Sequence, residues 1–402
     1  MDLRKSPALV GTLNFAHALD HFVMLIYPAV VLALSGAFNL PYGELLSYSI
    51  GGFVAFGLFS MPFGWIGKRV SGHRLMTVFF LGVGVGCVLA GLAQTPLQIG
   101  AALTLVGVFA AIYHPIGNSM LSAIDPARLG RIMGLNGLCG NLGVASAALV
   151  TGVLTDLISW RAAFIIPGLA AMIAGLAFWA FVPDPGPLRS PARAVDARRI
   201  PRSEMVAVFG VLLFSTAIGS FIFSATTVVM PKLFAERLTE LTSTVSGVGL
   251  LVFFVYALAA IAQIIVGSLV DRYSLSRIFL PIAALQVPVL LLTAFTGGVA
   301  TLLAALPMMF LVFGMVPINE VMVARYTPPE FRTRVYSVRY TLSFAAVAAA
   351  IPTVSYLHTT YGGFTELFVL LAGLAIPLAA SGLVLAWTER RPSVDAAQSA
   401  SA

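Results

Sequence analysis

Long apolar runs separated by short polar breaks dominate the chain. A hydrocarbon core is crossed by a helix of about 20 apolar residues, and twelve runs reach that length. Strands of a membrane barrel would instead alternate apolar and polar residues over about 10 positions. The predicted helices cover residues 8–35, 44–67, 75–94, 97–123, 131–156, 161–182, 205–233, 244–270, 276–296, 299–324, 334–357 and 364–387. The pattern therefore predicts an all-α integral membrane protein with twelve transmembrane helices.

The twelve predicted helices form two sets of six, divided by a polar segment. This segment, residues 183–204, holds five prolines, so it cannot be helical throughout. We expect an N-terminal six-helix half over residues 1–182, a linker over 183–204 and a C-terminal six-helix half over 205–388. Residues 389–402 are small and polar, which predicts a disordered tail.

The two halves repeat one pattern. The charged break at residues 267–272, which reads GSLVDR, follows the break at residues 64–69, GWIGKR, by 203 residues. Pro28 and Pro231 are also 203 residues apart, and Pro115 and Pro317 are 202 residues apart. Recurrence at a fixed offset indicates two pseudo-repeated halves.

Composition agrees with a lipid environment. The chain is 59% hydrophobic and 10% charged, whereas soluble domains are about 25% charged. The net charge is +7, and the basic residues are unevenly distributed. All but four of the 23 lie at the termini, in the linker, or in breaks between helices on the same side of the membrane as the termini and linker. Such a surplus marks the cytoplasmic side of a membrane protein.

This charge distribution predicts the orientation. Both termini and the linker should be cytoplasmic, in a protein of the inner membrane. The basic surplus is then a topology signal, so no nucleic-acid partner is expected. Cys87 and Cys139 each lie inside an apolar run and match no metal or redox spacing, so we interpret them as packing residues.

Ionisable residues concentrate in the first predicted helix. At 100° per residue, Asn14, His17 and His21 fall within an arc of about 80°, and Asp20 lies about 60° from His17. Ionisable groups at bilayer depth are costly and usually face a cavity or one another. We interpret Asp20, His17 and His21 as a proton-coupling group, with hydrogen-bonded packing as the alternative. Asn14 and His114 are expected to line the substrate cavity.

The repeat places serines at the matching positions of the second half. His17 corresponds to Ser220 and His21 to Ser224, so both serines are predicted to face the same cavity. Asn118 corresponds to Glu320, and Asn136 corresponds to Arg339. We predict that Asn118 lines the cavity and that Glu320 and Arg339 form a charge pair. Whether this pair is structural or functional stays open.

The sequence lacks the signatures of soluble enzymes. No phosphate-binding loop of the Gly-x-x-x-x-Gly-Lys type occurs, so we expect neither ATP drive nor enzymatic activity. His17 and His21 are spaced to bind a metal, and His114 could join them across the bundle. This alternative is weaker than a protonatable group, so no metal and no cofactor are expected.

The charged breaks resemble those of the major facilitator superfamily. In that family a Gly-x-Leu-x-Asp-Arg break joins helices 2 and 3 and, again, helices 8 and 9. Residues 267–272 fit it, whereas Lys68 stands where the acid of the first copy should be. The resemblance implies the twelve-helix fold and a cytoplasmic gate that depends on Asp271. The other expected gate residues are Arg272, Lys68, Arg69, Arg131 and Arg334.

A closer resemblance is to the fosmidomycin-resistance type of exporter. It rests on His17 and Asp20, on residues 113–115 (YHP) and on residues 140–143 (GNLG). It implies a secondary active transporter, a monomer, that exports a small molecule across the cytoplasmic membrane by alternating access, by antiport against protons. The alternatives are uptake of a metabolite or a transition metal, or a sensor or assembly factor that transports nothing.

Overall fold

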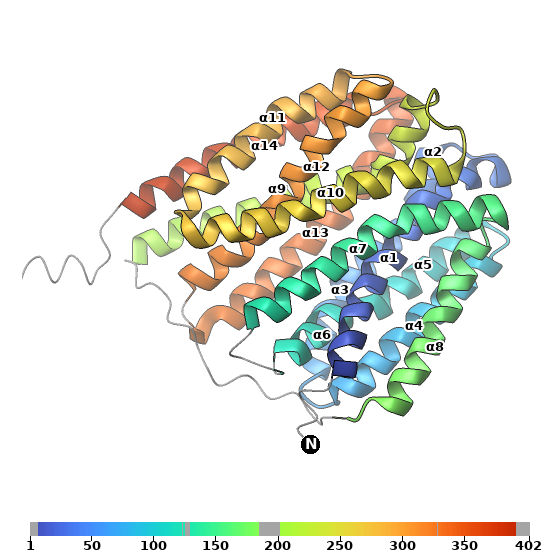
Figure 1. Cartoon of the computed structure of the whole chain (residues 1–402), viewed down its shortest axis with the longest axis horizontal. Coiled ribbons are helices and arrows are strands. Elements are labelled where there is room, and N and C mark those ends of the chain that lie inside the picture. Colours follow the sequence, from blue (N-terminus) through green and yellow to red (C-terminus); the bar gives the residue numbers. More distant parts are fainter. Residues whose placement is uncertain (1–6, 123, 125–128, 185–201, 328, 391–402) are drawn as a thin grey trace, which may run out of the picture. The chain divides into compact units, whose positions relative to one another are not determined.

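The structure is a computed structural model that describes residues 7–122, 124, 129–184, 202–327 and 329–390. Every regular element in these residues is a helix (Figure 1). The helices are α1 (Pro7–Phe38), α2 (Tyr42–Ser47), α3 (Ile50–Ile66), α4 (Gly72–Leu92), α5 (Pro96–Ala110), α6 (Tyr113–Ser122), α7 (Leu129–Leu157), α8 (Ala162–Phe181), α9 (Arg202–Arg237), α10 (Val245–Arg272), α11 (Leu275–Phe295), α12 (Val299–Tyr326), α13 (Pro329–Tyr361) and α14 (Thr365–Arg390).

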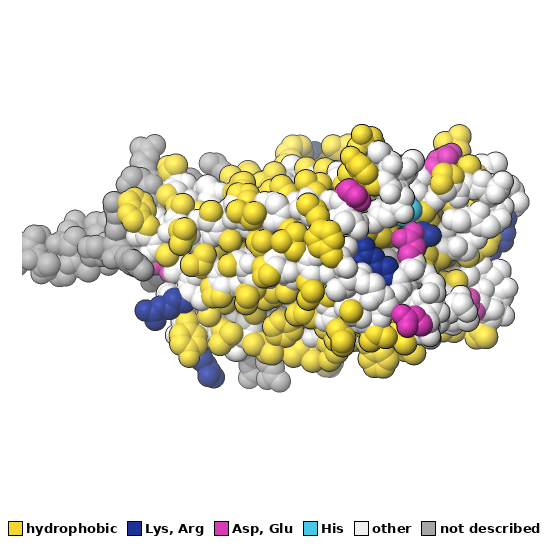
Figure 2. Space-filling view, turned by 90° about the horizontal axis from the view of Figure 1, so that it is seen from above, with side chains coloured by type: hydrophobic (Ala, Val, Ile, Leu, Met, Phe, Trp, Pro, Cys, Tyr) yellow, Lys and Arg dark blue, Asp and Glu magenta, His cyan; other side chains and the backbone are white. Residues whose placement is uncertain are grey.

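The predicted all-α membrane fold is confirmed. Twelve helical spans within the described residues are long and apolar enough to cross a membrane, and each overlaps one predicted span. Large apolar side chains remain exposed, including those of Leu157, Phe181 and Phe295. Hydrophobic side chains cover much of the surface that Figure 2 shows, with few charged side chains among them. Such a surface suits contact with lipid.

Two predicted spans are interrupted. The second contains α2 and α3, which are separated at Tyr48 and Ser49. The fourth contains α5 and α6, which are separated at Ala111 and Ile112. Pro115 has no N–H to donate, and in a continuous helix its ring would clash with the carbonyl group of Ala111, four residues earlier. Pro115 therefore favours the break between α5 and α6.

The chain forms two compact units, whose boundaries lie partly inside helices. Unit 1 contains Met1–Arg193, Val228–Ala257 and Ile351–Gly362. Unit 2 contains Ala194–Thr227, Leu258–Ala350 and Gly363–Ala402. Unit 1 therefore includes α1 to α8 together with one end of α9, α10 and α13.

Helices of unit 1 pack closely where glycines replace larger residues. α1 packs on α7, α4 packs on α5 and α8, and α3 packs on α5 (Figure 1). At the crossing of α3 and α5, Gly52 and Gly107 bring the two backbones into contact. Small residues allow such close approach between membrane helices, which favours van der Waals packing.

A polar cluster in unit 1 joins α9 to α13. Glu236 on α9 accepts a hydrogen bond from His358 Nε2 on α13 at 3.0 Å, and Lys232 Nζ lies 3.3 Å from the same carboxylate. The ring of His358 lies edge-on to Tyr42, with 4.8 Å between ring centroids. Nearby, Ser355 donates to the carbonyl oxygen of Gly43 at 2.6 Å. We call Tyr42, Lys232, Glu236 and His358 the α9–α13 cluster.

Unit 2 is organised around α11, which packs on α12 and α14 (Figure 1). The carboxylate of Glu389, at the end of α14, accepts from the backbone N–H groups of Leu275 and Ser276 at 3.0 and 3.1 Å. It also accepts from the hydroxyl of Tyr326 at 2.9 Å. An acid at a helix N-terminus satisfies free N–H groups and complements the helix dipole.

An acid performs a similar task in unit 1. Asp184 follows α8 and accepts a hydrogen bond from the hydroxyl of Ser71, the residue that caps α4, at 2.7 Å. α4 and α8 thus correspond to α11 and α14, as the repeat predicts. Two predicted boundaries shift, because Arg202–Glu204 of the predicted linker begins α9 and Glu389–Arg390 of the predicted tail ends α14. The linker and tail otherwise lie largely outside the described residues.

Candidate functional site

α1 carries the ionisable residues of the site in its buried middle. Asn14, His17 and Asp20 are buried, and Asp20 is 0% exposed. His21 is one turn beyond His17 and partly buried. The helix is continuous from Pro7 to Phe38, so the i, i+4 spacing puts both histidines on one face.

The break before α6 brings a second set of side chains to α1. Tyr113 and His114 occupy the first turn of α6. The ring of Tyr113 stacks on that of His17, with 4.8 Å between centroids and 15° between planes. His114 Nε2 lies 3.4 Å from Oδ2 of Asp20. His114, predicted to line the cavity, and Asp20, predicted to couple protons, are therefore in contact.

The hydrogen bonds of His17 fix its tautomer. Its Nδ1 lies 2.7 Å from the backbone carbonyl oxygen of Asn136 on α7. Since a carbonyl only accepts, Nδ1 carries the hydrogen and Nε2 of the neutral ring has a lone pair. Nε2 of His21 lies 3.2 Å away and donates to it.

A buried amide extends this network toward α6. Tyr113 donates from its hydroxyl to Oδ1 of Asn136 at 2.7 Å, and the same hydroxyl lies 3.1 Å from the carbonyl oxygen of Leu13. Nδ2 of Asn136 donates to Oδ1 of Asn118 at 3.1 Å. Asn136 on α7 thus contacts both α1 and α6, which holds the ring of His17 against α7.

The glycines of residues 140–143 make room for this arrangement. A Cβ atom at Gly140 would lie 2.7 Å from Cε1 and 2.8 Å from Nε2 of His17. A Cβ atom at Gly143 would collide with the backbone of Ala18. Both positions therefore require glycine if α7 is to approach α1 and His17 at this distance.

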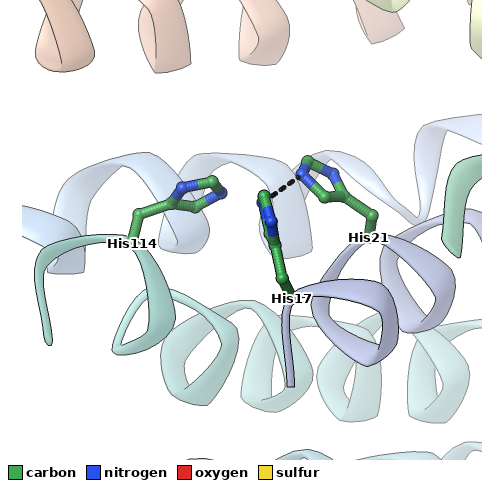
Figure 3. A group of neighbouring side chains, drawn as sticks. All are labelled: His17, His21 and His114. Carbon is green, nitrogen blue, oxygen red and sulfur yellow. Dashed lines mark hydrogen bonds between the residues drawn. The ribbon is translucent and has the colours of Figure 1, made fainter. Parts of the chain in front are cut away.

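Three histidines converge at the centre of the site. His17, His21 and His114 each offer a ring nitrogen, and these atoms all lie within 4.8 Å of one another. Figure 3 shows the rings of His17 and His21 from α1 and that of His114 from α6 turned toward a common point. Together the three residues form what we call the histidine cluster.

Asp20 and Asn14 have unsatisfied polar atoms. Neither carboxylate oxygen of Asp20 forms a hydrogen bond of good geometry with a described residue, although His114 is close. Oδ1 of Asn14 is also buried without a hydrogen bond to a described residue. Leaving such groups unpaired in a low-dielectric interior is unfavourable, so this part of the site is suited to a bound cation or polar ligand.

The remaining predicted cavity residues belong to unit 2. Ser220 lies 2.7 Å from Ser343, oxygen to oxygen, and Ser224 is buried. Nη1 of Arg339 donates to Oε1 of Glu320 at 2.6 Å. This contact joins α12 to α13 as the contact between Asn118 and Asn136 joins α6 to α7, and so follows the internal repeat.

The predicted gate residues lie at helix ends. Asp271 and Arg272 are exposed in the last turn of α10, and Lys68 and Arg69 are exposed just after α3. The side chains of Arg131 and Arg334 lie outside the described part of the structure. Arg325 was not predicted as a gate residue, but its guanidinium donates to the carbonyl oxygen of Val270 and ties α12 to the end of α10.

Sequence reasoning missed two features of the site. It assigned no role to Tyr113, although this residue lies in the motif of residues 113–115. The adjacent His114 was the only feature of the sequence that pointed to this position. It also missed the contact of His17 with the carbonyl of Asn136, because a backbone carbonyl leaves no mark in the sequence. The glycine motif hinted at this contact, since glycine permits close approach.

Curated relatives match only part of the chain. A multi-drug resistance efflux pump PmrA homolog of Lactococcus lactis subsp. lactis is 29% identical over 120 residues, which is 30% of this chain and 29% of the relative. The puromycin resistance protein pur8 of Streptomyces alboniger is 28% identical over 123 residues, which is 30% of this chain and 24% of the relative. The chain thus matches less than a third of the length of each.

Solved structures match along nearly the whole chain. A bacterial homolog of the human lysosomal transporter Spinster, inward-facing and unoccupied, has a TM-score of 0.74 at 13% identity, covering 96% of this chain and 95% of its own. The peptide transporter POT has a TM-score of 0.72 at 16% identity, covering 95% and 94%. At these identities the likeness concerns the fold.

The family model supplies the remaining evidence. The model described as Major Facilitator Superfamily matches residues 12–239 and 212–402. Together these matches cover both halves of the fold and the whole of the histidine cluster. The chain therefore belongs to the major facilitator superfamily.

Proposed function

We propose that the protein is a secondary active transporter that exports a small solute by alternating access, driven by proton entry. Members of the superfamily are transporters and not enzymes. The efflux pump and the puromycin resistance protein among the relatives support export. The motifs at residues 113–115 and 140–143 support a relationship to the fosmidomycin-resistance type of exporter.

The orientation and location are part of the same proposal. The basic residues favour cytoplasmic termini and a cytoplasmic linker, in the inner membrane of the cell. The basic ends of α3 and α10 then belong to the cytoplasmic gate. The α9–α13 cluster, at the other end of α9 and α13, faces the outside.

The buried carboxylate of Asp20 is the observation that carries the coupling proposal. A coupled transporter needs a site that binds a cation in one part of its cycle and releases it in another. Asp20 is 0% exposed, forms no hydrogen bond with a described residue and has His114 Nε2 at 3.4 Å. Its negative charge is tolerable in the membrane only beside a positive charge or when neutralised.

The test uses puromycin as the first probe, followed by a panel of other drugs. The protein is reconstituted in proteoliposomes that contain a pH-sensitive dye, and an imposed proton gradient should drive puromycin uptake into vesicles of inverted orientation. Asp20→Asn should abolish proton-driven accumulation but retain exchange of labelled for unlabelled solute. Glu366→Gln, which changes an exposed carboxylate of α14, is the matched control.

The possible results separate the alternatives. Accumulation by Asp20→Asn at the wild-type rate would show that Asp20 is not the coupling group. If the wild-type protein moves neither protons nor any drug of the panel, the proposal of export is wrong, and a non-transporting sensor or assembly factor is favoured.

A further inference from the structure

The histidine cluster has the composition of a metal site. His17 and His21 come from adjacent turns of α1, and His114 comes from the first turn of α6 (Figure 3). These are three of the five histidines of the chain. Their ligand atoms lie within 4.8 Å of one another.

Two of the three histidines have neighbours of the kind that orient a metal ligand. Such a histidine usually donates its second ring N–H to a backbone carbonyl or a carboxylate, which fixes its tautomer and orientation. His17 donates from Nδ1 to the carbonyl oxygen of Asn136 at 2.7 Å, which directs the lone pair of Nε2 into the cluster. His114 has one ring nitrogen 3.4 Å from the carboxylate of Asp20.

Packing alone does not account for this arrangement. It would explain the stacking of His17 on Tyr113 and the hydrogen bond between His17 and His21. It would leave the carboxylate of Asp20 fully buried and without a hydrogen bond to a described residue. A divalent cation bound to His114 would supply the positive charge that this carboxylate lacks.

We propose that His17, His21 and His114 together bind one divalent transition-metal ion of the zinc class, with Asp20 and the carbonyl of Asn136 as outer partners. Imidazole suits zinc, cobalt, nickel and copper, whereas magnesium and calcium prefer oxygen ligands. Three protein ligands leave a position for water or another exchangeable ligand. This inference goes beyond export and replaces the sequence-based expectation that no metal binds.

The geometry requires only small movements. Nitrogen ligands bind zinc at about 2.0–2.1 Å, so in a tetrahedral site they lie roughly 3.4 Å apart. Nε2 of His17 and Nε2 of His21 already lie 3.2 Å apart. The other nitrogen–nitrogen distances are at most 4.8 Å. They would have to shorten by about 1.4 Å at most to reach the spacing of a zinc site, which rotation of the side chains can provide. In binding, the metal replaces the hydrogen bond between the two rings. The hydrogen on Nε2 of His21 is lost to solvent and Nδ1 of the same ring takes up another, so that His21 ligates through Nε2 as a neutral imidazole.

The test measures binding to full-length protein purified in detergent without a polyhistidine tag. Zn²⁺ is titrated by calorimetry, and Co²⁺ is titrated by visible absorption, which reports four-coordinate geometry. We expect one ion per chain. His17→Gln, His21→Gln and His114→Gln should each weaken binding by more than about 100-fold, and Asp20→Asn should weaken it about 10–100-fold as loss of an outer partner.

The chain provides its own control. His358→Gln removes a histidine from the α9–α13 cluster, outside the histidine cluster, and should leave both affinity and stoichiometry unchanged. Folding of each variant is checked by size-exclusion chromatography. If a histidine variant aggregates, the Co²⁺ spectrum of the wild-type protein decides, because the site predicts a four-coordinate spectrum that excess Zn²⁺ abolishes.

Two results would overturn the inference. One is a wild-type protein that binds neither ion at micromolar concentration. The other is a folded variant with all three histidines replaced by Gln that binds Zn²⁺ as tightly as the wild type. Binding is measured without a membrane gradient, so failure here leaves the export proposal untouched, and failure of export leaves the metal site untouched.

Discussion

Glu236 on α9 accepts a hydrogen bond from His358 on α13 at 3.0 Å, and the two helices are thereby joined within unit 1. The carboxylate also faces Lys232, so one acid holds two cationic or protonatable groups. Hydrogen bonds to charged groups contribute about 1.5–3 kcal/mol, less when the carboxylate is partly exposed as here. A contact of this size can bias a conformational equilibrium.

Loss of Glu236 should increase opening at this end of the bundle. We expect Glu236→Ala to increase the labelling rate of Val354→Cys, a buried position one turn from His358, by up to about tenfold. Labelling is measured in permeabilised membranes after replacement of Cys87 and Cys139. Glu240→Ala, at an exposed acid in the loop after α9, is the control and should leave the rate unchanged. An unchanged rate in Glu236→Ala would show that this contact does not restrain α9 and α13 at this end.

The distribution of basic residues predicts the orientation of the linker. A cysteine at Ser190 should resist an impermeant thiol reagent in intact cells and react after the cells are permeabilised. Glu240→Cys, on the opposite side, should react in intact cells. The reverse pattern would show that the orientation is wrong.

The gate should depend on Asp271 more than on Lys68. Because Lys68 stands where the superfamily has an acid, only Asp271 supplies a carboxylate that cationic residues and helix N-termini can stabilise. We expect Asp271→Asn to reduce the initial rate of transport in the proteoliposome assay about tenfold or more, which corresponds to about 1.4 kcal/mol, and Lys68→Ala to reduce it about twofold or less. Equal and small losses in both variants would remove this assignment.

The pair of Glu320 and Arg339 should act mainly on stability. Arg339 is buried and its Nε has no hydrogen bond to a described residue, so Glu320→Gln would leave a guanidinium without its charge partner. We expect a loss of about 1–3 kcal/mol in the free energy of unfolding, moderated because Glu320 is partly exposed. Thermal unfolding in detergent measures the effect.

A double variant tests this interpretation of the pair. Arg339→Gln combined with Glu320→Gln removes both charges and should be less destabilised than the sum of the two single variants. A loss equal to that sum would mean that the two side chains do not stabilise each other, despite their separation of 2.6 Å.

The glycine at position 140 should be essential to the site. Gly140→Ala would place a methyl group against the ring of His17 and should destabilise the protein by about 1–3 kcal/mol. Gly134→Ala on the same helix has no heavy atom within 4 Å of the added carbon and should be neutral or slightly stabilising. Thermal unfolding of both variants provides the comparison, and equal thermal midpoints would contradict the packing described around His17.

Periodicity and charge predicted the twelve spans because a membrane requires long apolar runs with few polar interruptions. They did not predict the break before Tyr113. Pro115 favours the break, yet the corresponding Pro317 lies inside the continuous helix α12, so proline alone does not determine it. Helical spacing put His17 and His21 on one face, but the contacts of His17 with Asn136 and of Asp20 with His114 depend on how α1, α6 and α7 pack.

The acids at the carboxyl ends of the sixth and twelfth spans, Asp184 just after α8 and Glu389 in the last turn of α14, determine how far each half of the repeat extends along the chain. Asp184 accepts a hydrogen bond from the capping residue of α4, and Glu389 accepts hydrogen bonds from the first N–H groups of α11. In each half, an acid at the end of the sixth transmembrane segment therefore binds the start of the third. A six-helix fragment cut at the last apolar residue of its sixth segment would lose the acid that binds the start of its third segment. The smallest six-helix unit that keeps its own helix contacts therefore extends a few polar residues past the apolar run.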